Sequence, residues 1–363
     1  MKIGILGTRG IPNEYGGFEQ FAEFFAVRMQ ERGHELTVYN SSLHPYKESQ
    51  FKGVNIRVCN DPEDRYGSFG QFIYDRNCIL DSRSQHFDIL LLLGYTSSAV
   101  WMHLLPKNTK VVSNMDGLEW KRSKYSKPVQ AFLRWSEKRA ARKSDALIAD
   151  SRAIQGYLRS KYGLDSNYTA YGAEVFSNPD SALLAQYGVE PNKYTLLIAR
   201  PEPENNVHLI CEAHVKSGID LPLLIIGRFT NAYGQKLQAQ YAGTNIRFIG
   251  PLYDLNVLNN LRYHAAIYFH GHSVGGTNPS LLEAMASSSL ICAHDNPFNR
   301  AVLESDAFYF SSVEELSELL KQVPVKADHA HFITENIKKI EQYYSWDTIT
   351  TQLETYFKEV LSK

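Results

Sequence analysis

One stretch of the sequence decides the fold class: Ala266-Ile-Tyr-Phe-His-Gly-His-Ser-Val-Gly-Gly-Thr-Asn-Pro-Ser-Leu-Leu-Glu-Ala-Met285. Its apolar start predicts a strand and its glycines predict a loop, while Asn278 and Pro279 predict the N-cap and the first residue of a helix. The first N–H groups of that helix would point into the loop, where they can bind an anion. Glu283 lies one turn deeper on the same helix face, so its carboxylate could accept hydrogen bonds from a diol beside the anion. A nucleotide diphosphate presents an anion and a ribose diol at this spacing.

Short apolar strands alternate with helical patterns on both sides of this stretch. The strands expected in the first half are Ile3–Leu6, Leu36–Tyr39, Ile56–Cys59, Ile89–Leu93, Val111–Asn114 and Ala146–Ala149, with a helix over Phe18–Arg32. Those expected in the second half are Tyr194–Ala199, Leu223–Ile226, Ile246–Ile249, Ala266–Phe269, Ser289–Ala293 and Phe308–Phe310. This alternation is typical of parallel sheets covered by helices. The sequence therefore predicts an α/β fold with two doubly wound, Rossmann-like domains that face each other across a cleft.

The length of 363 residues also favours two domains, each large enough for its own core. We expect one domain over residues 1–172 and a second over residues 173–345, joined near Tyr171-Gly172-Ala173. Residues 346–363 predict a helix with one apolar face, which we expect to pack back on the first domain. The residues of that face are Ile349, Leu353, Tyr356, Phe357 and Val360.

The composition excludes several classes of protein. A hydrophobic content of 44% with 21% charged residues is typical of a globular chain and excludes a disordered or fibrous one. The longest apolar runs, such as Ile89–Leu93, are far below the roughly 20 residues of a membrane span, and the chain opens directly into a strand. We therefore expect neither a membrane span nor a signal peptide. The four cysteines are scattered without C-x-x-C spacing, which predicts neither disulfides nor a zinc site and favours the cytoplasm.

The net charge of −1 hides an asymmetry, because residues 1–172 hold 24 Lys and Arg against 18 Asp and Glu. Nine of these basic residues lie between Lys121 and Lys143, opposed by Glu137 alone. The apolar residues interleaved with them are Val129, Phe132, Leu133, Trp135 and Ala140. The segment is interpreted either as a solvated helix that covers the core or as a contact with an anionic membrane surface or acceptor. Nucleic acid is not an expected partner, since no recognition motif accompanies the charge.

A second glycine loop follows the first strand and ends at Gly16-Gly17, where a helix is expected to begin. Its spacing is G-x-x-G-x-x-G rather than the G-x-G-x-x-G of dinucleotide-binding folds, and the second strand ends in Asn40 instead of an acid. NAD is therefore not an expected cofactor. Gly16 and Gly17 either let the backbone approach a ligand at the helix N-terminus or serve only a loop that needs positive φ angles.

Over essentially its whole length the chain resembles the retaining GT-B glycosyltransferases of the family-4 type, and more narrowly the bacterial rhamnosyltransferase-like subgroup. The motifs that carry the resemblance are the Gly7–Gly17 loop with Gly-Gly-Phe-Glu, the segments Asn114–Arg122 and Ala199–Asn206, and the stretch His272–Met285. It implies a cytoplasmic, metal-independent hexosyltransferase that extends a bacterial surface polysaccharide with retention of configuration. The implied donor is dTDP-rhamnose, with a UDP-sugar as the alternative. The implied acceptor is a lipid-linked saccharide at the inner face of the membrane.

The resemblance also implies roles for individual residues. Glu283 would bind the nucleotide ribose, the amides around Thr277–Ser280 the diphosphate and sugar, and Arg200 the diphosphate. Asp116 follows a strand end, where a carboxylate can orient or deprotonate an acceptor hydroxyl, although an Asx turn is the alternative. The predicted donor-binding residues are Gly16, Gly17, Arg200, Arg228, Gly275, Gly276, Thr277, Asn278, Pro279, Ser280 and Glu283. The predicted catalytic residues are Asp116 and Arg200, and the acceptor-side residues are Asp116 and Glu119.

Two positions depart from the broad family: Gly275 stands where a Glu would contact the donor hexose, and Asn205 where a Lys would contact phosphate. The departures favour either a different donor, such as a 6-deoxy sugar, or lost activity. A nucleotide-sugar 2-epimerase and a non-catalytic sugar-nucleotide-binding partner therefore remain as alternatives. His270, His272 and His294 do not have the spacing of metal ligands, so no metal is expected. Tyr253 and Asp254 are candidate contacts for the nucleotide base.

Overall fold

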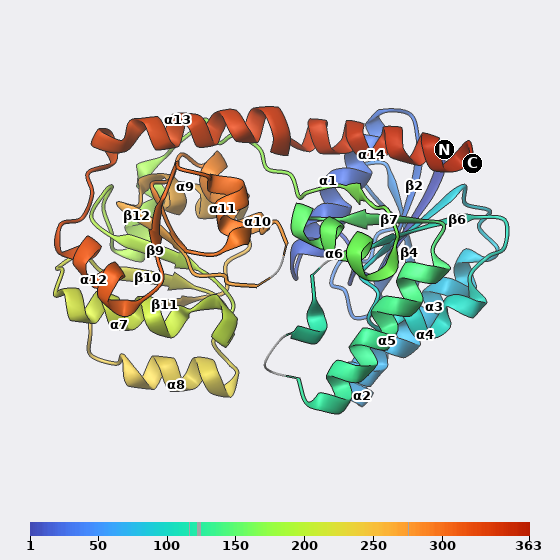
Figure 1. Cartoon of the computed structure of the whole chain (residues 1–363), viewed down its shortest axis with the longest axis horizontal. Coiled ribbons are helices and arrows are strands. Elements are labelled where there is room, and N and C mark those ends of the chain that lie inside the picture. The colour runs from blue at the N-terminus through green and yellow to red at the C-terminus, as the bar shows by residue number, and fades with distance from the viewer. Residues whose placement is uncertain (116, 122–124, 275) are drawn as a thin grey trace. The chain divides into compact units, whose positions relative to one another are not determined.

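The structure is a computed structural model that describes residues 1–115, 117–121, 125–274 and 276–363. Its contacts divide the chain into two compact units (Figure 1). The N-terminal unit holds Met1–Tyr171 together with Trp346–Lys363, and the C-terminal unit holds Gly172–Ser345. The chain therefore leaves the N-terminal unit once and returns to it.

The N-terminal unit is built on an eight-stranded sheet with the order β3-β4-β2-β1-β5-β6-β7-β8. Its strands are β1 (Lys2–Leu6), β2 (Glu35–Ser41), β3 (Gln50–Phe51), β4 (Val54–Cys59), β5 (Ile89–Leu93), β6 (Lys110–Asn114), β7 (Ala146–Ala149) and β8 (Asn167–Tyr168). All neighbouring pairs are parallel except β3 and β4. The central strand β5 is buried along its whole length, which explains its continuous apolar sequence.

Helices cover this sheet, and all of them except α14 lie on chain segments between its strands. They are α1 (Gly17–Glu31), α2 (Glu63–Tyr66), α3 (Gly70–Ser82), α4 (Ser98–Trp101), α5 (Lys127–Lys143), α6 (Arg152–Tyr162) and α14 (Trp346–Leu361). Helix α14 packs on α1 through its aromatic residues. The Trp346 ring stacks on Phe24 with centroids 4.9 Å apart, and Phe357 meets the Phe25 ring edge-on at 6.0 Å.

The C-terminal unit is built on a six-stranded, fully parallel sheet with the order β11-β10-β9-β12-β13-β14. Its strands are β9 (Thr195–Ile198), β10 (Leu223–Ile226), β11 (Ile246–Gly250), β12 (Ile267–His270), β13 (Ile291–His294) and β14 (Phe308–Phe310). Its helices are α7 (Val207–Ser217), α8 (Ala232–Gln240), α9 (Leu255–His264), α10 (Pro279–Ala286), α11 (Pro297–Leu303), α12 (Val313–Lys321) and α13 (Ala330–Lys339). Two Rossmann-like units are present, which confirms the predicted α/β class with two domains of this kind.

Among the residues that the structure describes, no helix combines the length and the apolar character that crossing a bilayer requires.

Candidate functional site

The carboxyl ends of β11, β10, β9 and β12 meet at one edge of the C-terminal sheet because these neighbouring strands are parallel. Arg200 follows β9 and Arg228 follows β10, and both side chains are exposed. Tyr253 follows β11, and its hydroxyl accepts from the Arg228 Nη2 at 3.2 Å. Ligands of parallel α/β sheets bind at this edge, where two cations can neutralise a diphosphate. The structure thus places both predicted arginines at one edge.

Glycines bring the strand ends of this edge close together. A Cβ at Gly227, just after β10, would lie 2.2 Å from the Ala199 carbonyl oxygen at the end of β9. A Cβ at Gly271, just after β12, would lie 2.2 Å from the Asn205 carbonyl oxygen. Only glycine permits either approach, and the approach fixes the spacing of the loops that follow β9, β10 and β12.

The loop after β12 leads into α10, as the sequence predicts. Asn278 is the N-cap, whose Oδ1 accepts from the Ser280 N–H at 2.9 Å, and Pro279 is the first helical residue. The Leu281 N–H donates to the Asn278 carbonyl oxygen at 3.0 Å. The predicted donor-binding residues of this segment that the structure describes are Gly276, Thr277, Asn278, Pro279, Ser280 and Glu283. Gly275 lies outside the described residues.

These hydrogen bonds correct one detail of the expected anion site. The N–H groups of Ser280 and Leu281 bond within the helix terminus, because the Asn278 cap that starts the helix also satisfies them. The Ser280 hydroxyl is likewise engaged, 2.6 Å from the Tyr268 hydroxyl. Hydrogen bonds to an anion would have to come from the loop before α10, while the positive end of the helix dipole still points to it.

Glu283, the predicted ribose ligand, is held by a partner that the sequence did not reveal. Its Oε2 accepts from Nη2 of Arg262 on α9, and only 1% of the Arg262 side chain is exposed. A second guanidinium nitrogen of Arg262 donates to the Asn259 Oδ1 at 2.9 Å. The buried cation therefore orients the Glu283 carboxylate. Arg262 gave no sequence signal because its partner lies 21 residues away on another helix.

Asn205, which departs from the broad family, has a structural role. Its side chain is buried, and its Nδ2 donates to the Arg200 carbonyl oxygen at 2.9 Å. The neighbouring residue Glu204 joins the loop after β9 to the loop after β12. Its carbonyl oxygen accepts from both the N–H and the hydroxyl of Ser273, at 2.9 and 2.8 Å. Asn205 thus stabilises the segment that carries Arg200.

Two histidines of this edge, His270 and His272, stack on each other. His270 is fully buried, and its ring lies 4.4 Å from that of His272 in a stacked arrangement. Burial lowers the pKa of His270 well below its usual value, with smaller contributions from His272 and His294. Within the described parts of the chain, no three His, Cys, Asp or Glu side chains gather as a metal site would require.

Asp254, a candidate contact for the base, instead caps α9. Its Oδ1 accepts from the Asn256 and Val257 N–H groups at 2.9 and 3.2 Å. The carboxylate is therefore used by the helix N-terminus.

The glycine loop of the N-terminal unit is held by Asn40. The buried Asn40 side chain accepts from the Ile11 N–H at 3.0 Å and donates to the Ile11 carbonyl oxygen at 2.8 Å. These two hydrogen bonds explain why the second strand has Asn40 at the position where a dinucleotide-binding fold carries an acid: an amide side chain both donates and accepts, whereas a carboxylate only accepts. Gly16 is the N-cap of α1 and Gly17 is its first residue, so both lie in the N-terminal unit. The other residues that are predicted to bind the donor, as far as the structure describes them, lie in the C-terminal unit.

The predicted acceptor side follows β6. Asp116 lies outside the described residues, and Glu119 begins a short 3₁₀ turn, Glu119–Lys121. The Trp120 indole of this turn donates to the Glu137 Oε2 on α5 at 2.9 Å. The turn that contains Glu119, a predicted acceptor-side residue, is therefore anchored to α5.

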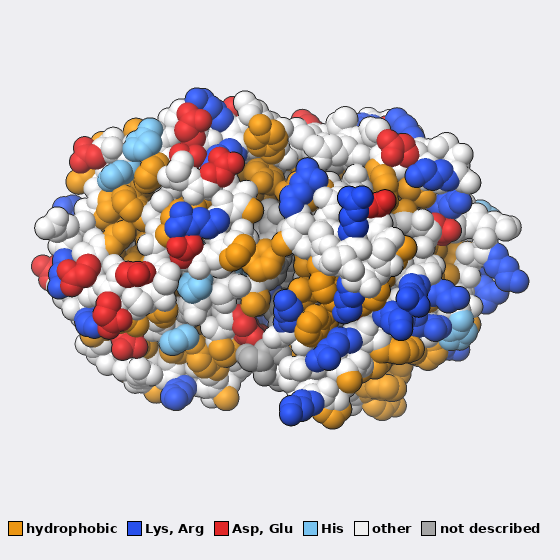
Figure 2. All heavy atoms as spheres, in the orientation of Figure 1, with side chains coloured by type: hydrophobic (Ala, Val, Ile, Leu, Met, Phe, Trp, Pro, Cys, Tyr) orange, Lys and Arg blue, Asp and Glu red, His pale blue; other side chains and the backbone are white. Residues whose placement is uncertain are grey.

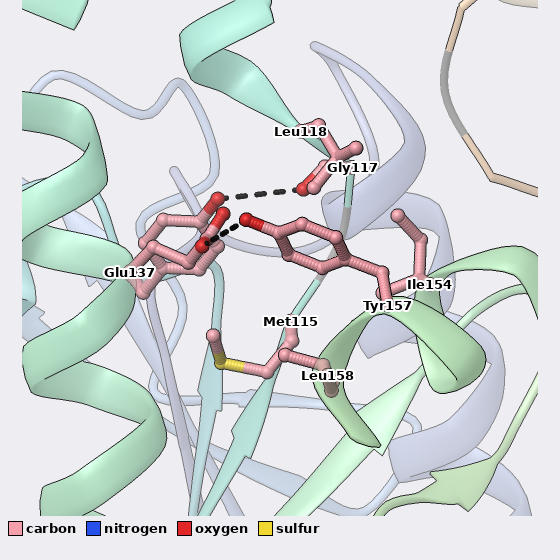
Figure 3. Close-up of a pocket in the computed structure, with 8 residues that line it drawn as sticks. Met115, Gly117, Leu118, Glu137, Ile154, Tyr157 and Leu158 are labelled. Atoms are coloured by element: carbon pink, nitrogen blue, oxygen red, sulfur yellow. Dashed lines mark hydrogen bonds between the residues drawn. The ribbon is translucent and has the colours of Figure 1, made fainter. Parts of the chain in front are cut away.

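Glu137 is buried and is the centre of a polar cluster, and Figure 3 shows its hydrogen bond with Tyr157. Its Oε1 accepts from the hydroxyls of Tyr157 and Tyr162, at 2.7 and 2.5 Å, and from the Lys161 ammonium at 3.1 Å. Burial and the neighbouring carboxylate raise the pKa of both tyrosines above the usual value. Glu137 was visible in the sequence as the lone acid among nine cations, but its partners on α6 were not.

Comparisons with known proteins agree with the division of the chain into an N-terminal and a C-terminal unit. Residues 1–174 match the family described as "Domain of unknown function (DUF1972)", and residues 183–340 match "Glycosyl transferases group 1". Comparison with curated proteins finds no match.

Solved structures resemble the chain over its full length. Sucrose-phosphate synthase from Thermosynechococcus elongatus has a TM-score of 0.81 at 14% identity, with 99% of each chain covered. HepE from Anabaena, in complex with UDP and glucose, has a TM-score of 0.76 at 16% identity, covering 99% of this chain and 100% of its own. A glycosyltransferase from Rickettsia africae has a TM-score of 0.66 at 13% identity, covering 99% and 98%. At these identities the likeness shows the GT-B fold.

Proposed function

We propose that the protein transfers a sugar from a nucleotide-diphospho donor to a saccharide acceptor, since residues 183–340 match the model of the glycosyl transferases group 1 family. One observation carries the proposal: the Arg262–Glu283 pair, the loop before α10 and the two exposed arginines lie in the unit that matches this family. The fold-mate HepE, whose structure holds UDP and glucose, supports the donor class.

The proposed reaction breaks the bond between the anomeric carbon of the sugar and the diphosphate. The diphosphate leaves with the bonding electrons, and Arg200, Arg228 and the α10 dipole stabilise its growing charge. The acceptor hydroxyl forms the new bond on the same face of the sugar, which retains the anomeric configuration. Its proton passes to the departing diphosphate, while Asp116 orients the hydroxyl. Binding therefore contributes mainly orientation and charge stabilisation, without a metal.

The finer assignments come from the family resemblance. We propose dTDP-rhamnose as the donor, a lipid-linked saccharide as the acceptor, and bacterial surface polysaccharide as the product. In this proposal Gly275 leaves out a carboxylate that a donor without a 6-hydroxyl would not pair.

The test is a panel of dTDP- and UDP-sugars, assayed in chelator for release of nucleoside diphosphate that depends on an added acceptor. We expect turnover with a 6-deoxy donor. We also expect Arg200→Ala to lower turnover roughly 100-fold, while Arg159→Ala on the N-terminal unit has no effect.

Each alternative outcome identifies a rival. Donor turnover without acceptor would indicate an epimerase, and donor binding without transfer would indicate a non-catalytic binding partner. Activity lost in chelator and restored by magnesium would contradict the metal-independent mechanism. Equal use of a glucosyl donor would remove the link between Gly275 and the sugar.

A further inference from the structure

A row of four aromatic rings lies on the surface of the N-terminal unit. The ring centroids are 5.9 Å apart between Phe69 and Phe72, 5.8 Å between Phe72 and Phe132, and 5.7 Å between Phe132 and Trp135. Phe69 is 64% exposed and Trp135 is 46% exposed. We refer to these four residues as the aromatic row. A soluble protein rarely exposes connected apolar side chains of this size without a binding partner.

The apolar surface extends beyond the aromatic row on the neighbouring helices. Tyr66 at the end of α2 is 62% exposed, and Val129 in the first turn of α5 is 39% exposed. By contrast, Leu133 and Ala140 of α5 are buried. The apolar residues of the basic segment therefore divide into two sets. Leu133 and Ala140 face the core, whereas Val129, Phe132 and Trp135 lie on the outer side, where Phe132 contacts Phe72 of α3.

The aromatic row is held in place rather than loosely attached. The Trp101 indole of α4 donates to the Phe72 carbonyl oxygen at 2.7 Å. Arg139 donates to the Ala99 carbonyl oxygen at 2.8 Å, and its guanidinium lies 5.5 Å from the centre of the Trp135 ring. These contacts fix α3 and α5 to α4, so the exposed rings form a preorganised surface.

The surroundings of the aromatic row are positively charged. The exposed cations of α5 are Lys127, Arg134, Lys138, Arg142 and Lys143. The one carboxylate of this helix, Glu137, is buried and paired with Lys161, so it does not offset the surface charge. Figure 2 shows blue and orange side chains together at the lower right, where Figure 1 draws α3 and α5.

We propose that the aromatic row and the cations of α5 dock on the surface of an anionic lipid bilayer. Aromatic rings favour the boundary between headgroups and acyl chains, and the cations are attracted to anionic headgroups. Both features are needed, and both occur on the same surface. Phe69 stacks on Phe72 and Phe132 stacks on Trp135, so one face of each ring is covered and is not open to stacking by a nucleic-acid base or a sugar. The proposal does not depend on the transfer reaction.

The test is sedimentation of the full chain with vesicles of phosphatidylcholine, alone or mixed with phosphatidylglycerol. We expect binding only to the anionic vesicles and a decrease with salt, because the attraction is screened over about 10 Å at 0.1 M. Lys138→Glu with Arg142→Glu should weaken binding more than about 25-fold, since each cation near the surface contributes about five-fold. Phe69→Ser with Trp135→Ser should weaken it at least ten-fold.

Matched controls come from the C-terminal unit: Tyr343→Ser changes a ring that is 60% exposed, and Lys193→Glu changes an exposed cation. Both should bind like the original chain. Quenching of tryptophan fluorescence by brominated lipid gives a second readout, and because the chain has four tryptophans, the part of the quenching that Trp135→Phe removes is assigned to Trp135. Absence of vesicle binding, equal binding to neutral vesicles, or full binding by the Phe69→Ser, Trp135→Ser variant would overturn the proposal. Transfer to a water-soluble acceptor should be unchanged in all variants, which separates this proposal from the enzymatic one.

Discussion

Arg262 and Glu283 depend on each other at the level of single residues. The Arg262 side chain, of which only 1% is exposed, is tolerated because an anion neutralises it, and the same cation orients the Glu283 carboxylate. Removing the Glu283 side chain would therefore lower both the affinity for a nucleotide and the free energy of unfolding, and the two effects could not be told apart. A conservative substitution separates the two effects.

Glu283→Gln should weaken binding of a nucleoside diphosphate by about 2 kcal/mol, as expected for a lost charged acceptor. It should also lower the free energy of unfolding, because Arg262 loses its counter-ion. Calorimetric titration measures the first effect and chemical denaturation the second. Glu335→Gln, which changes a surface pair with Lys338, is the control and should alter neither. Unchanged nucleotide affinity in folded Glu283→Gln would remove Glu283 from the site.

Asn205→Lys tests whether the departure from the broad family concerns phosphate binding. Because Asn205 is buried and bonds to the Arg200 carbonyl oxygen, the lysine should cost stability, about 1 kcal/mol for the lost hydrogen bond and more for burying an ammonium. Nucleotide affinity should not rise. Asn205→Ala provides the reference for the hydrogen bond alone. A tighter nucleotide complex with Asn205→Lys would show that this position can serve the diphosphate.

Among the helices and strands, the sequence predicted the elements whose bounds depend on residues close together in the chain. β5, β7, β10 and β14 have the predicted bounds because buried strands leave continuous apolar runs. β3 and β8 were missed, since two residues are too short to show a period. The Asn278 cap was predicted because capping acts over two residues. Arg262 and the partners of Glu137 were not, because contacts between different helices leave no spacing in the sequence.

Helix α5 anchors the turn Glu119–Lys121 through Glu137. Glu137→Gln keeps the size of the side chain but removes the charge that pairs with Lys161 and orients Trp120. We expect roughly ten-fold slower transfer with unchanged affinity for nucleoside diphosphate, because misplacing the acceptor segment impairs orientation alone. Tyr162→Phe removes one of the four donors and should have a smaller effect. A variant that is less stable but equally active would limit Glu137 to a structural role.

Helix α3 carries a buried carboxyl group, that of Asp75, whose surroundings disfavour its charged form. Burial raises the pKa of Asp75 to about 6, although the Ser97 hydroxyl donates to it at 2.5 Å. In the unfolded chain its pKa is about 4, so the native state holds the proton more tightly between these values. The stability that this group contributes is thus fully present below about pH 4 and is lost as the pH rises through about 6.

Asp75→Asn removes this dependence while keeping an oxygen that can accept from Ser97. The variant should be more stable than the original chain by about 2 kcal/mol near pH 8, and the difference should vanish near pH 4. Urea denaturation at both pH values measures it. Asp165→Asn, an exposed position on the same unit, should show neither effect. A constant difference at both pH values would rule out titration of Asp75 as the cause.

At the level of the whole molecule, the two units have separate cores but the N-terminal one is completed by α14. Trp346 is almost fully buried between aromatic rings of α1. Trp346→Ala should cost about 3–5 kcal/mol of the stability of the N-terminal unit and leave the C-terminal unit unchanged. Hydrogen exchange resolved by peptide distinguishes the units. Trp135→Ala at the exposed aromatic row is the control, and equal loss of protection in both units would mean that they unfold together.

The return of the chain to its first unit has a consequence for biosynthesis. Helix α14 is translated only after every residue of the C-terminal unit, although it covers Phe24 and Phe25 near the start of the chain. Domains generally fold in the order in which they leave the ribosome, but here the second unit can be completed while the first still lacks a helix. During that interval the apolar face of α1 is uncovered, which makes the nascent N-terminal unit a target for chaperones. Slow translation of the C-terminal unit would prolong this exposure, and early supply of α14 as a separate peptide would shorten it.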